Sequence, residues 1–132
     1  MIDFGLAGRI LLAALFIVAG VLHLVSPAPF LRIVPPFLPW SEALVAISGI
    51  AEISGGVGLL IPGLRRFAAY GLVVLLIAVF PANIYMAVAH VPFGGWMGQA
   101  WLQWLRLPFQ FVLIAWAWIY TAAPNAPLEK RA

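Results

Sequence analysis

Four apolar stretches, each of about the 20 residues that a helix needs to cross a bilayer core, cover most of this chain. Of its 132 residues, 65% are hydrophobic and 8% are charged, whereas a soluble domain has about 25% charged residues. The stretches are continuous, unlike the short alternating segments of a transmembrane β-barrel. The sequence therefore predicts an all-α integral membrane protein, a single domain built as a four-helix transmembrane bundle.

We expect the spans at about residues 6–25, 42–61, 67–89 and 101–121, followed by a polar tail at 122–132. Residues 26–40 are apolar but rich in proline, which disfavours helix. We therefore expect an irregular connection that lies in the interface or folds back over the bundle. Ser41 should cap the second span, and Pro81 should kink the third.

The basic residues indicate an orientation. In a four-span bundle, both termini and the turn after the second span lie on the same side of the membrane. The basic residues on that side are Arg9, Arg65, Arg66, Lys130 and Arg131. Those on the other side are Arg32 and Arg106. Cytoplasmic loops carry the excess of arginine and lysine. We therefore expect both termini and the polar tail in the cytoplasm, and we expect an integral protein of the bacterial cytoplasmic (inner) membrane.

Strongly polar residues within the spans share one half of the predicted bilayer. At 1.5 Å per residue, all of them fall within about 15 Å of the non-cytoplasmic face; they are His23, Glu52, Asn83, Gln103, Arg106 and Gln110. Polar groups at membrane depth are costly, so they turn inward or serve a function. These six residues, with Trp101 beside them, are the predicted ligand-binding residues.

The spacing within the fourth span supports an inward polar stripe. Gln103, Arg106 and Gln110 are separated by three and four residues, so they share one helix face. Glu52 needs a partner, and Arg106 is the predicted one because guanidinium and carboxylate form bidentate pairs. That pair could fix the helix register or belong to a ligand site, and the sequence leaves both open.

Other candidates also have both structural and functional interpretations. Asn83 could bond the carbonyl freed by Pro81 or a neighbouring helix, or contact a ligand. His23 could be an ordinary interfacial histidine, a proton donor or a ligand contact. Trp101 is first a residue of the interfacial aromatic belt, although it also flanks the polar band.

Composition excludes several classes of function. The chain has no cysteine and two histidines, which removes thiol relays and iron–sulfur clusters and predicts no metal site. No basic cluster indicates nucleic-acid binding, and no hydrolase triad or phosphate loop is present. We expect no intrinsic cofactor.

The sequence resembles the DoxX-like membrane proteins over residues from about 11 to 120. The motifs that carry the resemblance are Ala19–His23, Pro39–Trp40, Ile50–Gly56, Leu59–Pro62, Phe80–Ile84 and Leu105–Gln110. The resemblance implies a four-helix membrane bundle. Some DoxX-like proteins are subunits of quinone-linked oxidoreductases, and others assist the assembly of membrane proteins. Those that use cysteine pairs are no guide here.

Two functions follow as expectations. In the first, the chain is a non-autonomous subunit that binds a quinone- or lipid-like amphiphile in the polar pocket and works with a redox partner, at most as an accessory subunit of an oxidoreductase. In the second, it is an assembly factor or structural subunit without small-molecule turnover. Expected partners are membrane lipids and another membrane protein or a second copy of the chain. A self-contained enzyme or a transporter is the third alternative, although the spans lack the repeated broken helices of transporters.

Overall fold

The computed structural model describes residues 4–91 and 99–122, and in these residues the regular secondary structure is helical. It comprises α1 (Phe4–Val25), α2 (Ala28–Arg32), α3 (Ser41–Leu60), α4 (Arg65–Ala89) and α5 (Ala100–Ile119). Four of these helices are long and apolar enough to cross a membrane. The four predicted spans are confirmed as helices, and their ends shift by at most two residues. Most of the predicted tail lies outside the described residues.

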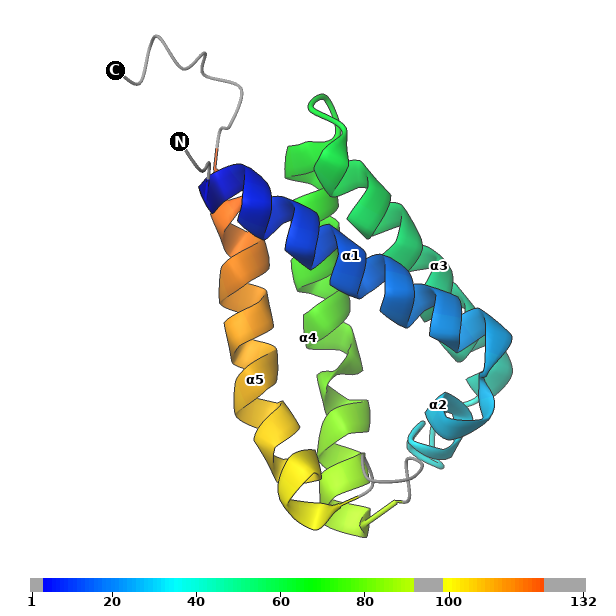
Figure 1. The fold of residues 1–132 in the computed structure, drawn as a ribbon. Coiled ribbons are helices and arrows are strands. Elements are labelled where there is room, and N and C mark those ends of the chain that lie inside the picture. Colours follow the sequence, from blue (N-terminus) through cyan, green and yellow to red (C-terminus); the bar gives the residue numbers. More distant parts are fainter. Residues whose placement is uncertain (1–3, 92–98, 123–132) are drawn as a thin grey trace, which may run out of the picture.

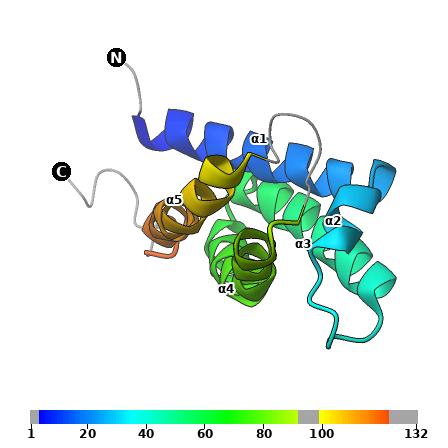
Figure 2. The ribbon, with the colours of Figure 1, turned by 90° about the horizontal axis from the view of Figure 1, so that it is seen from below.

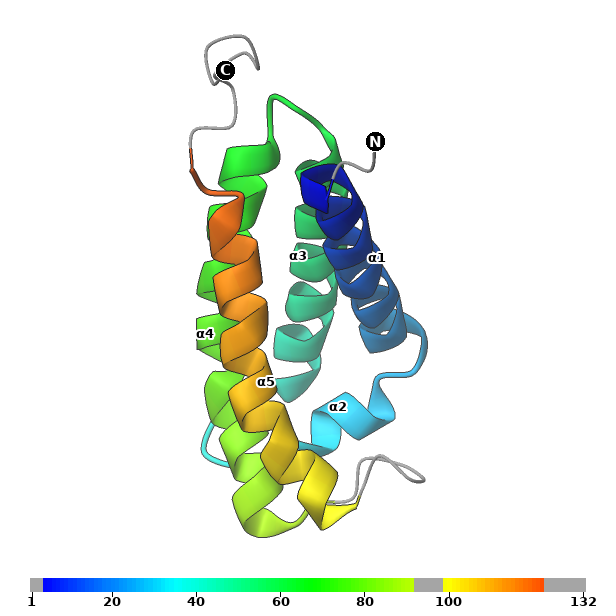
Figure 3. The same ribbon diagram turned by 60° about the vertical axis from the view of Figure 1, so that its left-hand side comes forward.

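The long helices converge at one end of the bundle and separate at the other (Figure 1). The closed end consists of the start of α1, the turn 61–64 between α3 and α4, and the end of α5 (Figures 1 and 3). The open end consists of the end of α1, the short helix α2, the start of α3, the end of α4 and the start of α5 (Figures 1 and 3). Viewed from the open end, α4 and α5 lie side by side and α1 crosses over α3 (Figure 2).

Glycines set the contact between α1 and α3. A Cβ atom added to Gly20 would lie 2.5 Å from the carbonyl oxygen of Gly49, and one added to Gly49 would lie 2.8 Å from Cβ of His23. Only residues without side chains allow the two backbones to approach this closely. On the other side of α3, Gly55 faces Leu72 and Gly58 faces Ala68 of α4. The glycines of α3 therefore allow close packing against both α1 and α4.

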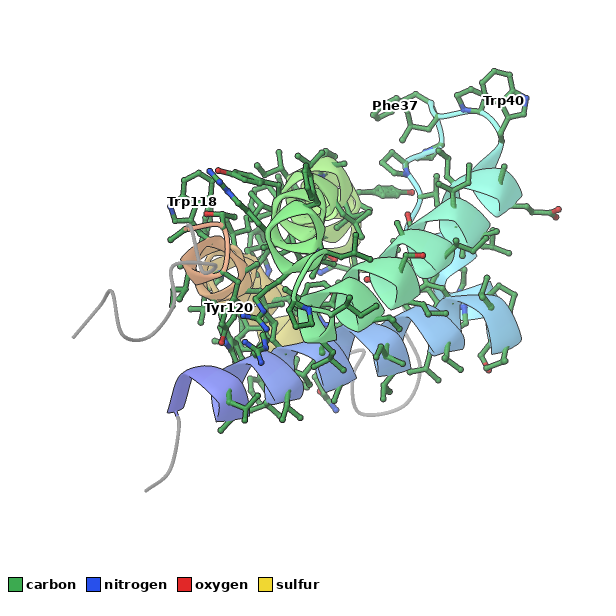
Figure 4. All side chains as sticks on the ribbon, turned by 90° about the horizontal axis from the view of Figure 1, so that it is seen from above. Phe37, Trp40, Trp118 and Tyr120 are labelled. Carbon is green, nitrogen blue, oxygen red and sulfur yellow. The ribbon has the colours of Figure 1, made fainter. Side chains whose placement is uncertain are left out.

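The apolar core occupies the closed end. Leu12 of α1, Leu59 of α3 and Leu72 of α4 are almost fully buried there, and Ala117 and Tyr120 complete the core from α5. The hydroxyl of Tyr120 also reaches the carbonyl oxygen of Gly5, at 3.5 Å. Figure 4 shows Tyr120 on the side of α5 that faces α1. This packing holds the four long helices together at one end and leaves the other free to separate.

The connection between α1 and α3 differs from its prediction. Ala28–Arg32 forms the short helix α2, with Pro27 as N-cap and a proline in its first turn, where the missing amide has no helical partner to lose. Trp40, in the left-handed conformation with φ 56°, is the N-cap of α3, and no side chain caps this helix. The prediction that Ser41 caps it is wrong, because Ser41 is already helical. α2 packs against α3, so the connection does fold back onto the bundle.

Candidate functional site

A cavity of about 800 Å³ lies in the half of the bundle that includes the open end. All five helices contribute to its walls, which are mostly aliphatic and aromatic. Its polar side chains are His23, Ser48, Glu52, Asn83, Arg106 and Gln110. Small-molecule sites typically have 300–1,000 Å³ and few convergent polar groups. The cavity therefore has the size of a small-molecule site, with apolar walls and a few convergent polar groups.

Five of the seven predicted binding residues line this cavity. His23 comes from α1, Glu52 from α3, Asn83 from α4, and Arg106 and Gln110 from α5. The sequence predicts them from their depth and, for Arg106 and Gln110, from their shared helix face. The structure thus brings together polar residues from all four long helices in one half of the bundle, whereas the core of the other half is apolar.

Gln103 and Trp101 do not line the cavity. Gln103 is 1% exposed, and its Nε2 donates a hydrogen bond to the carbonyl oxygen of Val91, at 2.6 Å. It therefore ties the start of α5 to the residues that follow α4. Trp101 is 64% exposed, so its ring lies on the outer surface of the bundle. This arrangement agrees with the interpretation of Trp101 as a belt residue.

His23 and Glu52 lie side by side across the contact between α1 and α3, and they form an ion pair when the imidazole is protonated. Nδ1 of His23 lies 3.0 Å from a carboxylate oxygen of Glu52 and 2.7 Å from the carbonyl oxygen of Ala19. A carbonyl oxygen only accepts, so Nδ1 carries a proton and donates it to Ala19, while the Glu52 carboxylate lies beside the same ring edge. The imidazole also stacks on Phe30 of α2, with ring centroids 3.8 Å apart. His23 therefore connects a charged group of the cavity to the short helix at its end.

This ion pair differs from the predicted pair of Glu52 with Arg106. Arg106 also lines the cavity, and its Nη1 lies 3.7 Å from Sδ of Met86. The difference follows from helix packing: α1 approaches α3 closely at Gly49, one turn before Glu52, which brings His23 within reach. The fourth span packs against α4 instead.

A second polar group links α4 to α5 beside Pro81. Nδ2 of Asn83 donates to Oε1 of Gln110, and Nε2 of Gln110 donates to the carbonyl oxygen of Leu76. Pro81 lacks an amide hydrogen, so the helix hydrogen bonds of this turn are incomplete. The expectation that Asn83 bonds a neighbouring helix is confirmed, but the side chain that reaches a carbonyl near the proline is Gln110.

Phe30 and Ser48 are among the lining residues that the sequence does not predict as parts of the site. Phe30 lies in a segment that the sequence marked only as an apolar connection, and its stacking on His23 depends on the formation of α2. Ser48 precedes Gly49 and is a weak signal, because serine is common on small-residue faces of membrane helices. No sequence pattern distinguished either residue.

The fold and the cavity together define a class of protein: a helical bundle with four helices of membrane-spanning length and an amphipathic cavity in one half. More particularly, the chain belongs to a family described as a domain of unknown function (DUF8561), which matches residues 12–121. No curated protein and no solved structure matches the chain. The family assignment therefore covers nearly the whole bundle and carries no activity with it.

Proposed function

We propose that this chain binds a quinone- or lipid-like amphiphile in the cavity and acts as a non-autonomous subunit beside a redox partner. The observation that carries the proposal is the cavity itself, in which polar side chains from four long helices converge between apolar walls. Arg106 and His23 would donate hydrogen bonds to the carbonyl or phosphate oxygens of a head group. In this proposal, the redox partner supplies the electron transfer.

The cavity also offers an apolar tail a path into lipid. Ile47 of α3 and Phe109 of α5 line the cavity and are 62% and 52% exposed. Lining residues with that exposure mark places where the cavity reaches the outer surface of the bundle. An amphiphile could therefore keep its head among the polar residues while its chain leaves sideways between helices. The resemblance to the DoxX-like proteins, some of which serve quinone-linked enzymes, supports this hypothesis.

The proposed ligand site can be tested by filling the cavity. Ala82→Phe adds a ring to the cavity wall, whereas Ala115→Phe adds the same ring to an exposed face of α5 outside the lining. With decylubiquinone as the probe, we expect Ala82→Phe to weaken binding at least about tenfold, which corresponds to about 1.4 kcal/mol. Ala115→Phe should bind as the wild type does. Quenching of tryptophan fluorescence in detergent measures both.

Mass spectrometry of a lipid extract from the purified wild type complements that titration. Retention of a quinone or another amphiphile, lost in Ala82→Phe and kept in Ala115→Phe, would support the proposal. A wild type that retains no amphiphile and does not bind decylubiquinone would contradict it. Equal binding by both variants would place any bound probe outside the cavity.

We propose further that both termini are cytoplasmic and that the membrane is the bacterial inner membrane. The five-to-two distribution of basic residues is the basis. The chain lacks cysteine, so single cysteines report without background. Ala28→Cys, at the exposed start of α2, should react with an impermeant maleimide in intact cells, and Gly63→Cys should react only after lysis. A Cβ atom at Gly63 meets no atom within 4 Å. The reverse labelling would invert the topology.

An assembly or structural role is the second candidate. Phe37 and Trp40 are 80% and 79% exposed, and Figure 4 shows them projecting beyond the bundle near the start of α3. Exposed aromatic residues of this kind suit an interfacial anchor or a contact with another membrane protein. This role gains support if the wild type binds no amphiphile but Phe37→Ala with Trp40→Ala abolishes a defined association with a partner or a second copy.

A further inference from the structure

Three arginines gather at the closed end of the bundle, away from the cavity. They are Arg9 of α1 and Arg65 and Arg66 in the first turn of α4. In residues 4–91 and 99–122 the carboxylates are Glu42, at the start of α3, and Glu52, which pairs with His23. The positive charge at the closed end is therefore not balanced by a carboxylate of the described chain.

Helix geometry directs Arg9 toward α3 and α4. Ala13 and Ile17 of α1 lie against Gly56 of α3. Arg9 precedes Ala13 by one helical turn and so occupies the same face of α1. At that level α3 ends at Leu60 and α4 begins. The side chain of Arg9 thus belongs to the junction of three helices.

Two features of this junction are electrostatically unfavourable. Nε of Arg65 donates to the carbonyl oxygen of Leu59, at 3.4 Å, which holds Arg65 at the end of α3. The charges of Arg9 and Arg65 lie close enough to repel each other. Nε of Arg9 is buried and has no hydrogen-bond partner. A buried donor without a partner and repulsion between two like charges are both costly, and an anion between the two guanidinium groups would relieve both.

We propose that Arg9 and Arg65 bind a phosphate oxyanion, supplied by the head group of an anionic phospholipid. Arg9 lies little more than one turn inside the end of a helix of membrane-spanning length, which is the depth of the head-group layer. Guanidinium groups match the oxygens of a phosphate in bidentate geometry. Basic sites between helix ends are typical binding sites for anionic head groups. Free phosphate has the same chemistry, so the experiment must separate the two sources.

The test compares thermal unfolding in detergent with added dioleoylphosphatidylglycerol, dioleoylphosphatidylcholine or inorganic phosphate. We expect phosphatidylglycerol to raise the Tm of the wild type by about 3 °C or more, and phosphatidylcholine to raise it less. Arg9→Gln and Arg65→Gln should lose at least half of that rise. Arg66→Gln removes the same charge at the same end and should keep the rise, because the Arg66 guanidinium lies over the ring of Tyr70, at 5.9 Å.

Each outcome decides between the alternatives. The expected pattern with phosphatidylglycerol alone supports a lipid site, and the same pattern with inorganic phosphate supports the site but assigns it to a free anion. The proposal is overturned if neither phosphatidylglycerol nor inorganic phosphate raises the Tm of the wild type. It is also overturned if all three variants lose the rise in Tm equally, because a general charge effect would then explain it. If Arg9→Gln does not fold, Arg65→Gln and native mass spectrometry of lipid adducts on the wild type provide the same comparison.

Discussion

His23→Leu should lower the free energy of unfolding by about 3–5 kcal/mol, the usual cost of breaking a buried ion pair. The substitution leaves the carboxylate of Glu52 in a largely apolar cavity without its partner at 3.0 Å. Glu52→Gln should cost less, because a neutral imidazole keeps its hydrogen bond to the carbonyl oxygen of Ala19. Chemical unfolding in detergent, followed by circular dichroism, measures both effects.

Two controls isolate the ion pair. Phe30→Leu removes the ring that stacks on His23 but keeps the pair, so it should cost less than His23→Leu. In a double-mutant cycle, His23→Leu and Glu52→Gln should be non-additive by about 1 kcal/mol or more, as residues in contact commonly are. Arg106→Gln with Glu52→Gln should be closer to additive. Additive effects for the first pair would mean that the contact contributes nothing to stability.

The long helices were predictable because the solvent constrains them. A chain that crosses a bilayer must bond its backbone internally over about 20 apolar residues, and stretches of that length are visible without any knowledge of packing. α2 was not predictable in the same way. Its prolines predict an irregular connection, yet prolines at the first turn of a helix are compatible with it.

The site was predictable in depth but not in its pairs. Depth follows from counting residues along a helix, and that count placed His23, Glu52, Asn83, Arg106 and Gln110 in the half that holds the cavity. Which residues meet depends on how the helices pack, and here a glycine face draws α1 onto α3.

Gln103 illustrates the same limit. Its inward face was predicted correctly, since the side chain is buried, but its nearest acceptor is the backbone of Val91 and not a group in the cavity. Helix periodicity gives the direction of a side chain. It does not give the identity of what lies in that direction, which here depends on where α4 ends.

The distinction between ligand site and internal bonding matters most for Gln110. This side chain is buried, accepts from Asn83 and donates to the carbonyl oxygen of Leu76. A primary amide has one further N–H and one further lone pair, so Gln110 could contact a ligand only with what remains. A loss of ligand binding on its replacement would therefore be confounded with a loss of stability, and Ala82→Phe is the sharper test of the cavity.

Gln110→Leu should accordingly destabilise the bundle by about 1–3 kcal/mol, since hydrogen bonds between membrane helices contribute about 0.6 and at most about 1.7 kcal/mol each. Leucine keeps most of the volume but removes both the hydrogen bond to the Leu76 carbonyl and the hydrogen bond from the Asn83 amide, close to Pro81. Asn83→Leu breaks one of the two bonds and should cost less. Gln99→Leu is the matched control, because Gln99 is exposed and makes no capping bond to α5. Unfolding in detergent measures all three, and equal stability of Gln110→Leu and Gln99→Leu would show that the link between α4 and α5 is dispensable.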